Sequence, residues 1–218
     1  MLDLIIEYDQ RLFFWLNNLG NEYFDWFWML LTNKVFNFLV YSIALIYLFK
    51  KTKTKSFISM ILFLLILILI SDQTSNLFKN YFERLRPCHD EQIFNSMRLV
   101  KNSCGGLYSF FSAHASNSFA LASFFFFVYY KIIHRKIILF FILALLVSYS
   151  RVYIGVHYPL DIIIGAFFGF PICFYLGIYT DFGVTGIWMG LLISLFVSSL
   201  LLLSRFQYLI KKLINNKN

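Results

Sequence analysis

Three short groups of residues carry the side chains that phosphate chemistry requires. Written as patterns they are K-x6-R-P, S-x-H and S-R-x5-H-x3-D, in that order along the chain. The residues concerned are Lys79 and Arg86, then Ser112, Ala113 and His114, and finally Arg151, His157 and Asp161. Lysine and arginine bind phosphate oxygens, and histidine serves as a nucleophile or as a general acid. The three groups together predict a single phosphate-handling site.

The first group depends on where the preceding apolar helix ends. If that helix continues to Pro87, Lys79 and Arg86 lie seven residues apart on one helix face, with a rise of about 10 Å between them. Both side chains could then reach one phosphate, and Pro87 would end the helix. Cations at the end of a membrane helix are also common as simple interfacial anchors, so this group alone leaves both interpretations open.

The second group has the features of a helix start. Ser112 is a good N-cap residue for the apolar run that follows, and the first free N–H groups, beginning at Ala113, could donate to a phosphate. A histidine at a helix start is more often a capping or interfacial residue. The functional interpretation of His114 therefore depends on the other two groups.

The third group is the most specific. His157 and Asp161 stand at positions i and i+4, and Pro159 suits the first turn of a helix. A carboxylate placed one turn away can accept the Nδ1–H of histidine and fix its tautomer. Proline disfavours helical geometry at the residue before it, so the spacing alone does not fix the contact between His157 and Asp161.

The elements that must position these residues are membrane helices. Of the 218 residues, 60% are apolar and 21% aromatic, and the mean hydropathy is +0.70, which excludes an ordinary soluble domain. Apolar runs occur at 35–49, 57–78, 110–130, 137–149, 160–179 and 184–203. A crossing needs about 20 residues, so we expect an all-α membrane protein with a bundle of about six transmembrane helices. The segment 9–31 is aromatic but too polar to cross, and it predicts an amphipathic interfacial helix before the bundle.

The charge distribution favours a membrane and not nucleic acid as the partner of this basic chain, whose net charge is +8. Lys50, Lys51, Lys53 and Lys55 occupy one short loop, and Lys131, Arg135 and Lys136 occupy another on the same predicted side. The positive-inside rule assigns that side to the cytoplasm and the three motifs to the opposite side. A sixth crossing would place Arg205, Lys211, Lys212 and Lys217 outside, so either the tail is an exception or the segment after Asp181 does not cross.

Two of the three cysteines fall in the loop between the first two motifs. Cys88 and Cys104 lie 16 positions apart. An oxidising compartment would allow them to form a disulfide, and two free thiols are the equally weighted alternative. Cys173 lies in an apolar run and is most simply a core residue.

The three motifs resemble those of the type 2 phosphatidic acid phosphatase (PAP2) superfamily, over residues 72–165 of a single domain spanning 1–218. The resemblance implies that His157 is the nucleophile that forms a phosphohistidine, that Asp161 orients it, and that His114 is the general acid. It further implies that Lys79, Arg86, Ser112, the amide of Ala113, and Arg151 hold the phosphate, with no metal or cofactor. The second motif departs from the usual Pro-Ser-Gly-His, because it reads Phe111-Ser112-Ala113-His114.

The resemblance predicts a metal-independent lipid phosphatase in a bacterial inner membrane, with its active site facing the periplasm or the exterior. Undecaprenyl diphosphate is the first expected substrate. Lipid A is the close alternative, and phosphatidylglycerol phosphate and phosphatidic acid are further ones. A non-catalytic protein that binds or transports a lipid phosphate is the alternative from a different class. The sequence specifies no oligomeric state.

Overall fold

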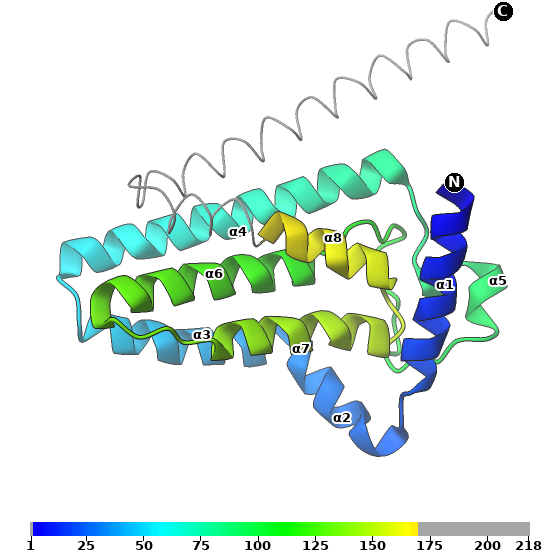
Figure 1. Cartoon of the computed structure of the whole chain (residues 1–218), viewed down its shortest axis with the longest axis horizontal. Helices are drawn as coiled ribbons and strands as arrows, with labels where there is room; N and C mark the ends of the chain where they lie inside the picture. The colour runs from blue at the N-terminus through cyan, green and yellow to red at the C-terminus, as the bar shows by residue number, and fades with distance from the viewer. Residues whose placement is uncertain (1, 170–218) are drawn as a thin grey trace, which may run out of the picture.

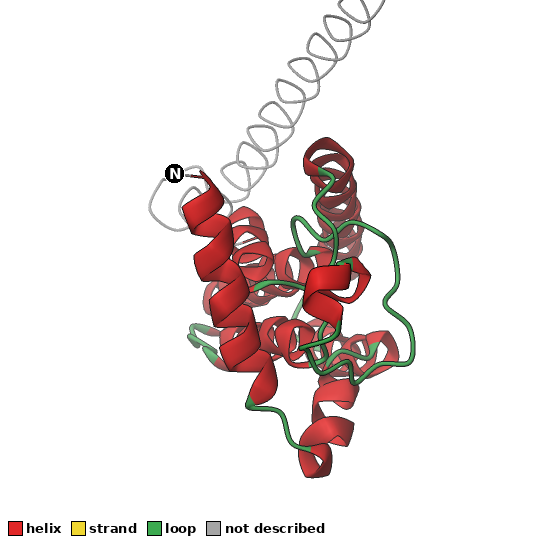
Figure 2. Ribbon diagram, turned by 90° about the vertical axis from the view of Figure 1, so that its right-hand side faces the viewer, coloured by secondary structure: helices red, strands yellow, loops and turns green. Residues whose placement is uncertain are grey.

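The computed structural model describes residues 2–169 as a bundle of helices, with a long loop at one end (Figures 1 and 2). The helices are α1 (Leu2–Asn18), α2 (Glu22–Leu31), α3 (Lys34–Phe49), α4 (Thr54–Phe82), α5 (Glu91–Phe94), α6 (Ala113–Ile133), α7 (Leu139–Tyr153) and α8 (Pro159–Gly169), with a 3₁₀ turn, η1, at Pro87–His89. Among these residues the only strand-like pairing is one isolated bridge between Leu85 and Tyr108.

The apolar helices confirm the predicted class of all-α membrane protein. Helices α4 and α6 are each long and apolar enough to cross a bilayer, and α2 and α3 together make a third candidate span that is bent by 53°. Helices α7 and α8 are apolar but shorter. The predicted run at 184–203, the charged tail and Cys173 lie outside the described residues, so the expected number of six crossings stays a prediction.

The N-terminal segment differs from the single interfacial helix expected over 9–31. It forms two helices, because the chain turns at residues 19–21 and the side chain of Asn21 caps α2 by accepting the Tyr23 N–H. Helix α1 is amphipathic, with Tyr8 and Trp15 exposed on one side. Its other side buries Phe13 and Asn17 against the end of the bundle, which α1 crosses in Figure 1.

Helix α6 is the central element, and close packing brings its start next to the start of α8. A Cβ atom added to Gly165 in α8 would lie 2.6 Å from the Ser112 carbonyl oxygen, so only glycine permits this approach. At Gly169, four residues on, an added Cβ atom would lie even closer to the backbone of α6, at the Ser116 carbonyl oxygen. Small residues at this spacing allow membrane helices to pack backbone to backbone. The close approach places the second and third motifs side by side.

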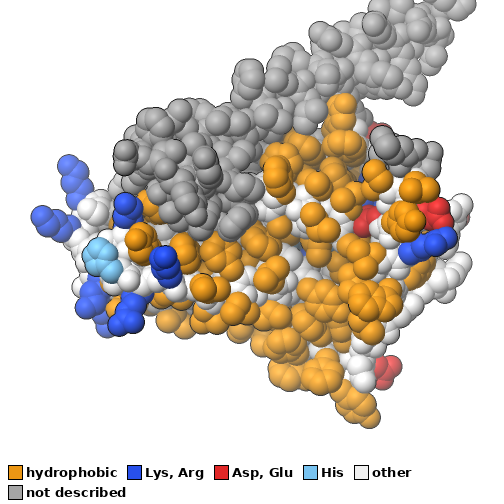
Figure 3. All heavy atoms as spheres, viewed as in Figure 1, with side chains coloured by type: hydrophobic (Ala, Val, Ile, Leu, Met, Phe, Trp, Pro, Cys, Tyr) orange, Lys and Arg blue, Asp and Glu red, His pale blue; other side chains and the backbone are white. Residues whose placement is uncertain are grey.

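The two basic loops lie together at one end of the bundle, and the three motifs lie at the other end. In Figure 1 the α3–α4 and α6–α7 connections share the left end, and Figure 3 shows the lysine and arginine side chains gathered there. An apolar surface extends between this end and the opposite one (Figure 3). The predicted grouping of the basic loops on one side is therefore present in the fold.

Candidate active site

Residues from all three motifs line one cavity of about 550 Å³ at the α1 end of the bundle. Lys79 comes from the last turn of α4, His114 from the first turn of α6, and Arg151 from the last turn of α7. Ala113, at the start of α6, and Arg86 and His157, from the loops after α4 and before α8, complete this end of the cavity. Two histidines and the three motif cations thus share one space, which we call the phosphate site; Lys34, at the start of α3, lines the same cavity.

The path of the chain at Arg86 differs from the helical alternative considered for the first motif. Helix α4 ends at Phe82, and Glu83 adopts a left-handed conformation with φ of 49°. The backbone then pairs with the loop at 107–109, where the Arg86 N–H donates to the Leu107 carbonyl at 3.1 Å. Lys79 and Arg86 therefore do not share a helix face, and Pro87 begins a 3₁₀ turn instead of ending a helix.

The two buried arginines are held by neighbours that the motifs do not include. Arg86 Nη1 lies 3.3 Å from the Cys104 carbonyl oxygen, and Arg151 Nη1 donates to the hydroxyl of Thr32, at the junction of α2 and α3. The Nε atoms of both arginines are buried and have no hydrogen-bond partner within the described part of the chain. Each guanidinium therefore retains donor capacity for an anion in the cavity.

The start of α6 forms as expected, with Ser112 as its N-cap. The Ser112 hydroxyl accepts the Ala115 N–H at 3.4 Å, and the Ser112 N–H donates to the Asp161 carbonyl at 3.0 Å. Ser112 is fully buried behind the cavity and joins α6 to α8. Its role as a phosphate ligand stays a prediction.

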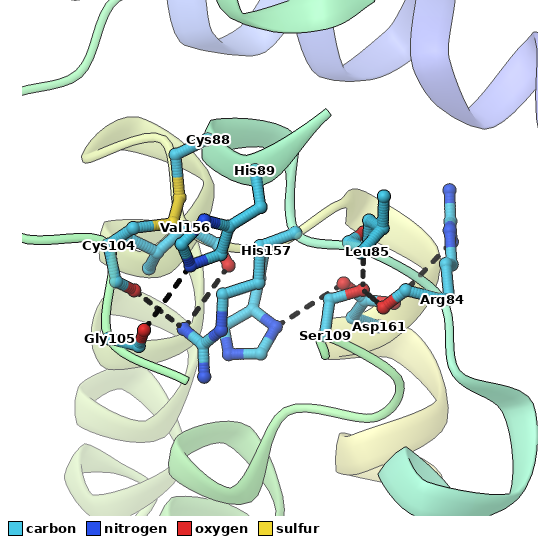
Figure 4. The surroundings of a disulfide bond; sticks show 11 residues. Arg84, Leu85, Cys88, His89, Cys104, Gly105, Ser109, Val156, His157 and Asp161 are labelled. Carbon is cyan, nitrogen blue, oxygen red and sulfur yellow. Dashed lines mark hydrogen bonds and ion pairs between the residues drawn. A yellow bond between two sulfur atoms is a disulfide. The ribbon is translucent and has the colours of Figure 1, made fainter. Parts of the chain in front are cut away.

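His157 and Asp161 have the geometry of an oriented histidine (Figure 4). Helix α8 begins at Pro159, so His157 lies in the turn before it, and its Nδ1 is 3.3 Å from Asp161 Oδ2. The Tyr158 N–H donates to the same carboxylate oxygen at 2.9 Å. Because Nδ1 is paired with the carboxylate, Nε2 is the nitrogen left for the cavity. Burial lowers the pKa of His157 well below its usual value, and the charges of Arg86 and Arg151 act in the same direction, so the ring is neutral at pH 7.

An ion-pair network behind His157 was not predicted from the sequence. Arg84 Nη2 lies 2.7 Å from Asp9 Oδ2 in α1, and Arg84 Nη1 lies 3.4 Å from Asp161 Oδ1. The Arg84 guanidinium also lies over the Tyr158 ring, 3.9 Å from its centroid, and Asp9 accepts the Leu160 N–H at 2.8 Å. Two features of the sequence could have indicated this network. Asp9 is an acidic residue in an aromatic-rich amphipathic segment, and Arg84 occupies one of the unspecified positions of the first motif.

Cys88 and Cys104 form a disulfide, which decides between the two alternatives left open by the sequence (Figure 4). The bridge closes the loop that follows Arg86. It also holds the Cys104 carbonyl in contact with the Arg86 guanidinium. The disulfide therefore supports one wall of the phosphate site.

Removing this disulfide is expected to lower the free energy of unfolding by about 3 kcal/mol, because it closes a loop with a sequence separation of 16. The Cys88→Ala/Cys104→Ala double variant should show this loss as a lower midpoint of thermal unfolding in detergent. A reducing agent should shift the wild type by a similar amount and leave the double variant unchanged. If the reducing agent shifts both proteins equally, the stabilisation does not come from this bridge.

The chain has relatives among known proteins. The PAP2 superfamily model matches residues 57–182. A lipid A 4'-phosphatase from Porphyromonas gingivalis is 35% identical over 166 residues, which cover 75% of this chain and 69% of the relative. A lipid A 4'-phosphatase from Bacteroides thetaiotaomicron is 32% identical over 172 residues, which cover 78% of this chain and 75% of the relative.

Two crystal structures share the fold. One is a transmembrane PAP2-type phosphatidylglycerolphosphate phosphatase from Bacillus subtilis, with a TM-score of 0.61 and 21% identity over 76% of this chain and 81% of that one. The other is Aquifex aeolicus LpxE, with a TM-score of 0.54 and 23% identity over 85% of this chain and 93% of that one. Because the family model covers more than half of the chain, and both relatives match over more than two thirds of their length, this chain belongs to the PAP2 superfamily of membrane phosphatases.

Proposed function

We propose that this protein removes a phosphate from lipid A at the extracytoplasmic face of the membrane. The observation that carries the proposal is the shape of the cavity, which joins the phosphate site to the lipid-facing surface. Phe38 of α3 and Leu65 of α4 both line the cavity, yet they are 71% and 57% exposed. A lipid can therefore enter sideways between α3 and α4 and present its phosphate to the cations without leaving the bilayer.

The first chemical step is the transfer of the phosphoryl group to His157. Nε2 of the neutral ring forms a bond to phosphorus while the bond from phosphorus to the ester oxygen breaks. His114 donates a proton to the leaving oxygen, which becomes the free hydroxyl of the lipid. Asp161 supports the positive charge that develops on His157. Lys79, Arg86 and Arg151 stabilise the charge on the equatorial oxygens in the transition state.

The second step returns the enzyme to its starting state. His114, now neutral, takes a proton from a water molecule as the water oxygen attacks phosphorus. The bond between phosphorus and Nε2 then breaks, which releases inorganic phosphate. His114 is left protonated and His157 neutral, as the next cycle requires. Each step uses only side chains of this chain and water.

Lipid A replaces undecaprenyl diphosphate as the favoured substrate. The sequence motifs bind the phosphate and do not distinguish the lipids. They therefore gave little reason to rank undecaprenyl diphosphate above lipid A. The two relatives reported above, each matched over more than two thirds of its length, are both named lipid A 4'-phosphatases. This agreement supports lipid A, with the 4'-phosphate as the proposed position.

Two features support an extracytoplasmic site. The Cys88–Cys104 disulfide lies in the loop beside the phosphate site, and such bonds persist in oxidising compartments. The basic loops lie at the opposite end of the bundle, where the positive-inside rule expects the cytoplasm. A bacterial inner membrane with the site facing the periplasm satisfies both features.

The test is inorganic phosphate release by the detergent-purified protein from lipid A, undecaprenyl diphosphate and phosphatidylglycerol phosphate, each with EDTA present. We expect release in EDTA, with the highest kcat/KM for lipid A. Loss of activity in EDTA that added metal restores would contradict the histidine mechanism, and a preference for another lipid would contradict the substrate. Orthovanadate binding without turnover of any of the three would indicate a non-catalytic protein.

A further inference from the structure

A second group of polar side chains lines the same cavity at a greater depth than the phosphate site. Asp72 comes from α4, Asn117 from α6, and Asn37 and Tyr41 from α3. Asn117 is three residues beyond His114, or about 4.5 Å along the helix, and Asp72 is seven residues before Lys79, or about 10 Å. These four residues therefore lie between the cations and the apolar part of the cavity.

Several of these polar atoms are buried and have no hydrogen-bond partner within the described part of the chain. Asn37 Oδ1, Tyr41 Oη and Asn117 Oδ1 make no hydrogen bond to any residue that the structure describes. Tyr41 is only 7% exposed, and its ring stacks on Phe125 with the centroids 5.3 Å apart, which fixes the direction of the hydroxyl. Unpaired buried polar atoms are destabilising, so these atoms, which face a cavity, are available to pair with a ligand that enters it.

The types of these atoms specify the ligand chemistry. The Asn117 amide already donates to Asp72 Oδ1 at 2.8 Å, so this part of the wall offers mainly acceptors: a carboxylate, two amide oxygens and one hydroxyl. A matching ligand must carry O–H or N–H donors close to its phosphate. A polyprenyl diphosphate has no such donor along its chain, and neither does phosphatidic acid beyond its phosphate. An N-acylated amino sugar has both hydroxyl and amide donors.

We propose that Asn37, Tyr41, Asp72 and Asn117 form a saccharide subsite that binds the phosphorylated amino sugar of the substrate. This inference rests on the proposed function, since the amino sugar is the part of lipid A that carries the phosphate. The apolar side chains deeper in the cavity then contact the acyl chains; they are Leu45, Leu64, Ile68 and Leu121. The three motifs bind only the phosphate, so the subsite would supply the selectivity of this chain for a lipid whose phosphate is attached to a sugar.

The subsite is tested with Tyr41→Phe and Asp72→Asn, two changes that nearly preserve side-chain volume. Both should lower kcat/KM for lipid A about tenfold, the effect of one lost hydrogen bond in a buried site. Orthovanadate occupies only the phosphate site, so its inhibition constant should be unchanged in Tyr41→Phe. In Asp72→Asn that constant should stay the same or fall, because a negative charge near Lys79 is removed.

Tyr47→Phe is the matched control, since Tyr47 is also in α3 but is 43% exposed and stacks on Tyr129 outside the cavity.

Two results would overturn the subsite. The first is an unchanged kcat/KM for lipid A in both variants. The second is a lower kcat/KM together with a higher vanadate inhibition constant, because that combination indicates a disturbed phosphate site. The same variants are also measured with undecaprenyl diphosphate, where no loss is expected. If the wild type hydrolyses lipid A and the variants match it, only the subsite fails. If the wild type hydrolyses undecaprenyl diphosphate but not lipid A, the proposed function fails and the subsite with it.

Discussion

Replacing His157 by asparagine is expected to lower kcat for phosphate release by about 10⁴-fold or more, because the variant lacks the proposed nucleophile. The buried amide cannot form a phosphoryl intermediate, although Lys79, Arg86 and Arg151 would still bind the substrate. The KM should therefore change much less than kcat. Rapid quench in alkaline detergent after mixing with ³²P-labelled substrate should show a base-stable, acid-labile label on the wild type and none on the variant.

His134→Asn provides the matched control for this prediction. The substitution is the same, but His134 caps the far end of α6, and asparagine tolerates its left-handed conformation with φ of 54°. This variant should retain wild-type activity and labelling. Persistence of the label in His157→Asn, or equal losses in the two variants, would show that His157 is not the nucleophile.

The chemical part of the site could be predicted from the sequence because the motifs are local. A spacing of four residues made the pairing of His157 with Asp161 possible, and the turn before α8 brings the two side chains together. Ser112 caps α6 because its side chain acts on the turn that follows. The conformation at Arg86 could not be predicted in the same way. There, helix and extended chain both suited the local sequence, and the pairing with residues 107–109 decided between them.

The parts of the site that escaped prediction all depend on contacts between distant segments. Thr32 reaches Arg151 across 119 positions, and Asp9 reaches the Leu160 N–H across 151 positions. Neither the hydrophobic periodicity of the sequence nor the spacing within a motif predicts contacts between positions so far apart. The segment 9–31 was predicted as a helix lying on the membrane before the first crossing, and the buried face of α1 shows that this part of the chain also packs against the end of the bundle that carries the three motifs.

Replacing Arg84 by methionine is expected to lower kcat by about 100-fold, although Arg84 does not line the cavity. The change leaves two buried carboxylates, Asp9 and Asp161, without their shared cation, and breaking a buried pair in this way costs about 3–5 kcal/mol. Asp161 then takes up a proton more readily and no longer supports a positive His157. The KM should change little, and the acidic limb of the pH profile of kcat should move to higher pH.

Arg98→Met separates this positioning role from a general loss of stability. Arg98 resembles Arg84 in pairing with an aspartate of the N-terminal region, Asp25, and in lying near an aromatic ring, that of Tyr153, but it has no contact with Asp161. Both variants should unfold at a lower temperature, whereas only Arg84→Met should shift the pH profile. Arg84→Lys should recover part of kcat because it restores the charge without the two-pronged geometry. If both methionine variants lose activity in proportion to their loss of stability and their pH profiles of kcat do not shift, Arg84 only holds α1 to the bundle. If the pH profile shifts in Arg84→Met alone, the N-terminal helix contributes to catalysis through Arg84.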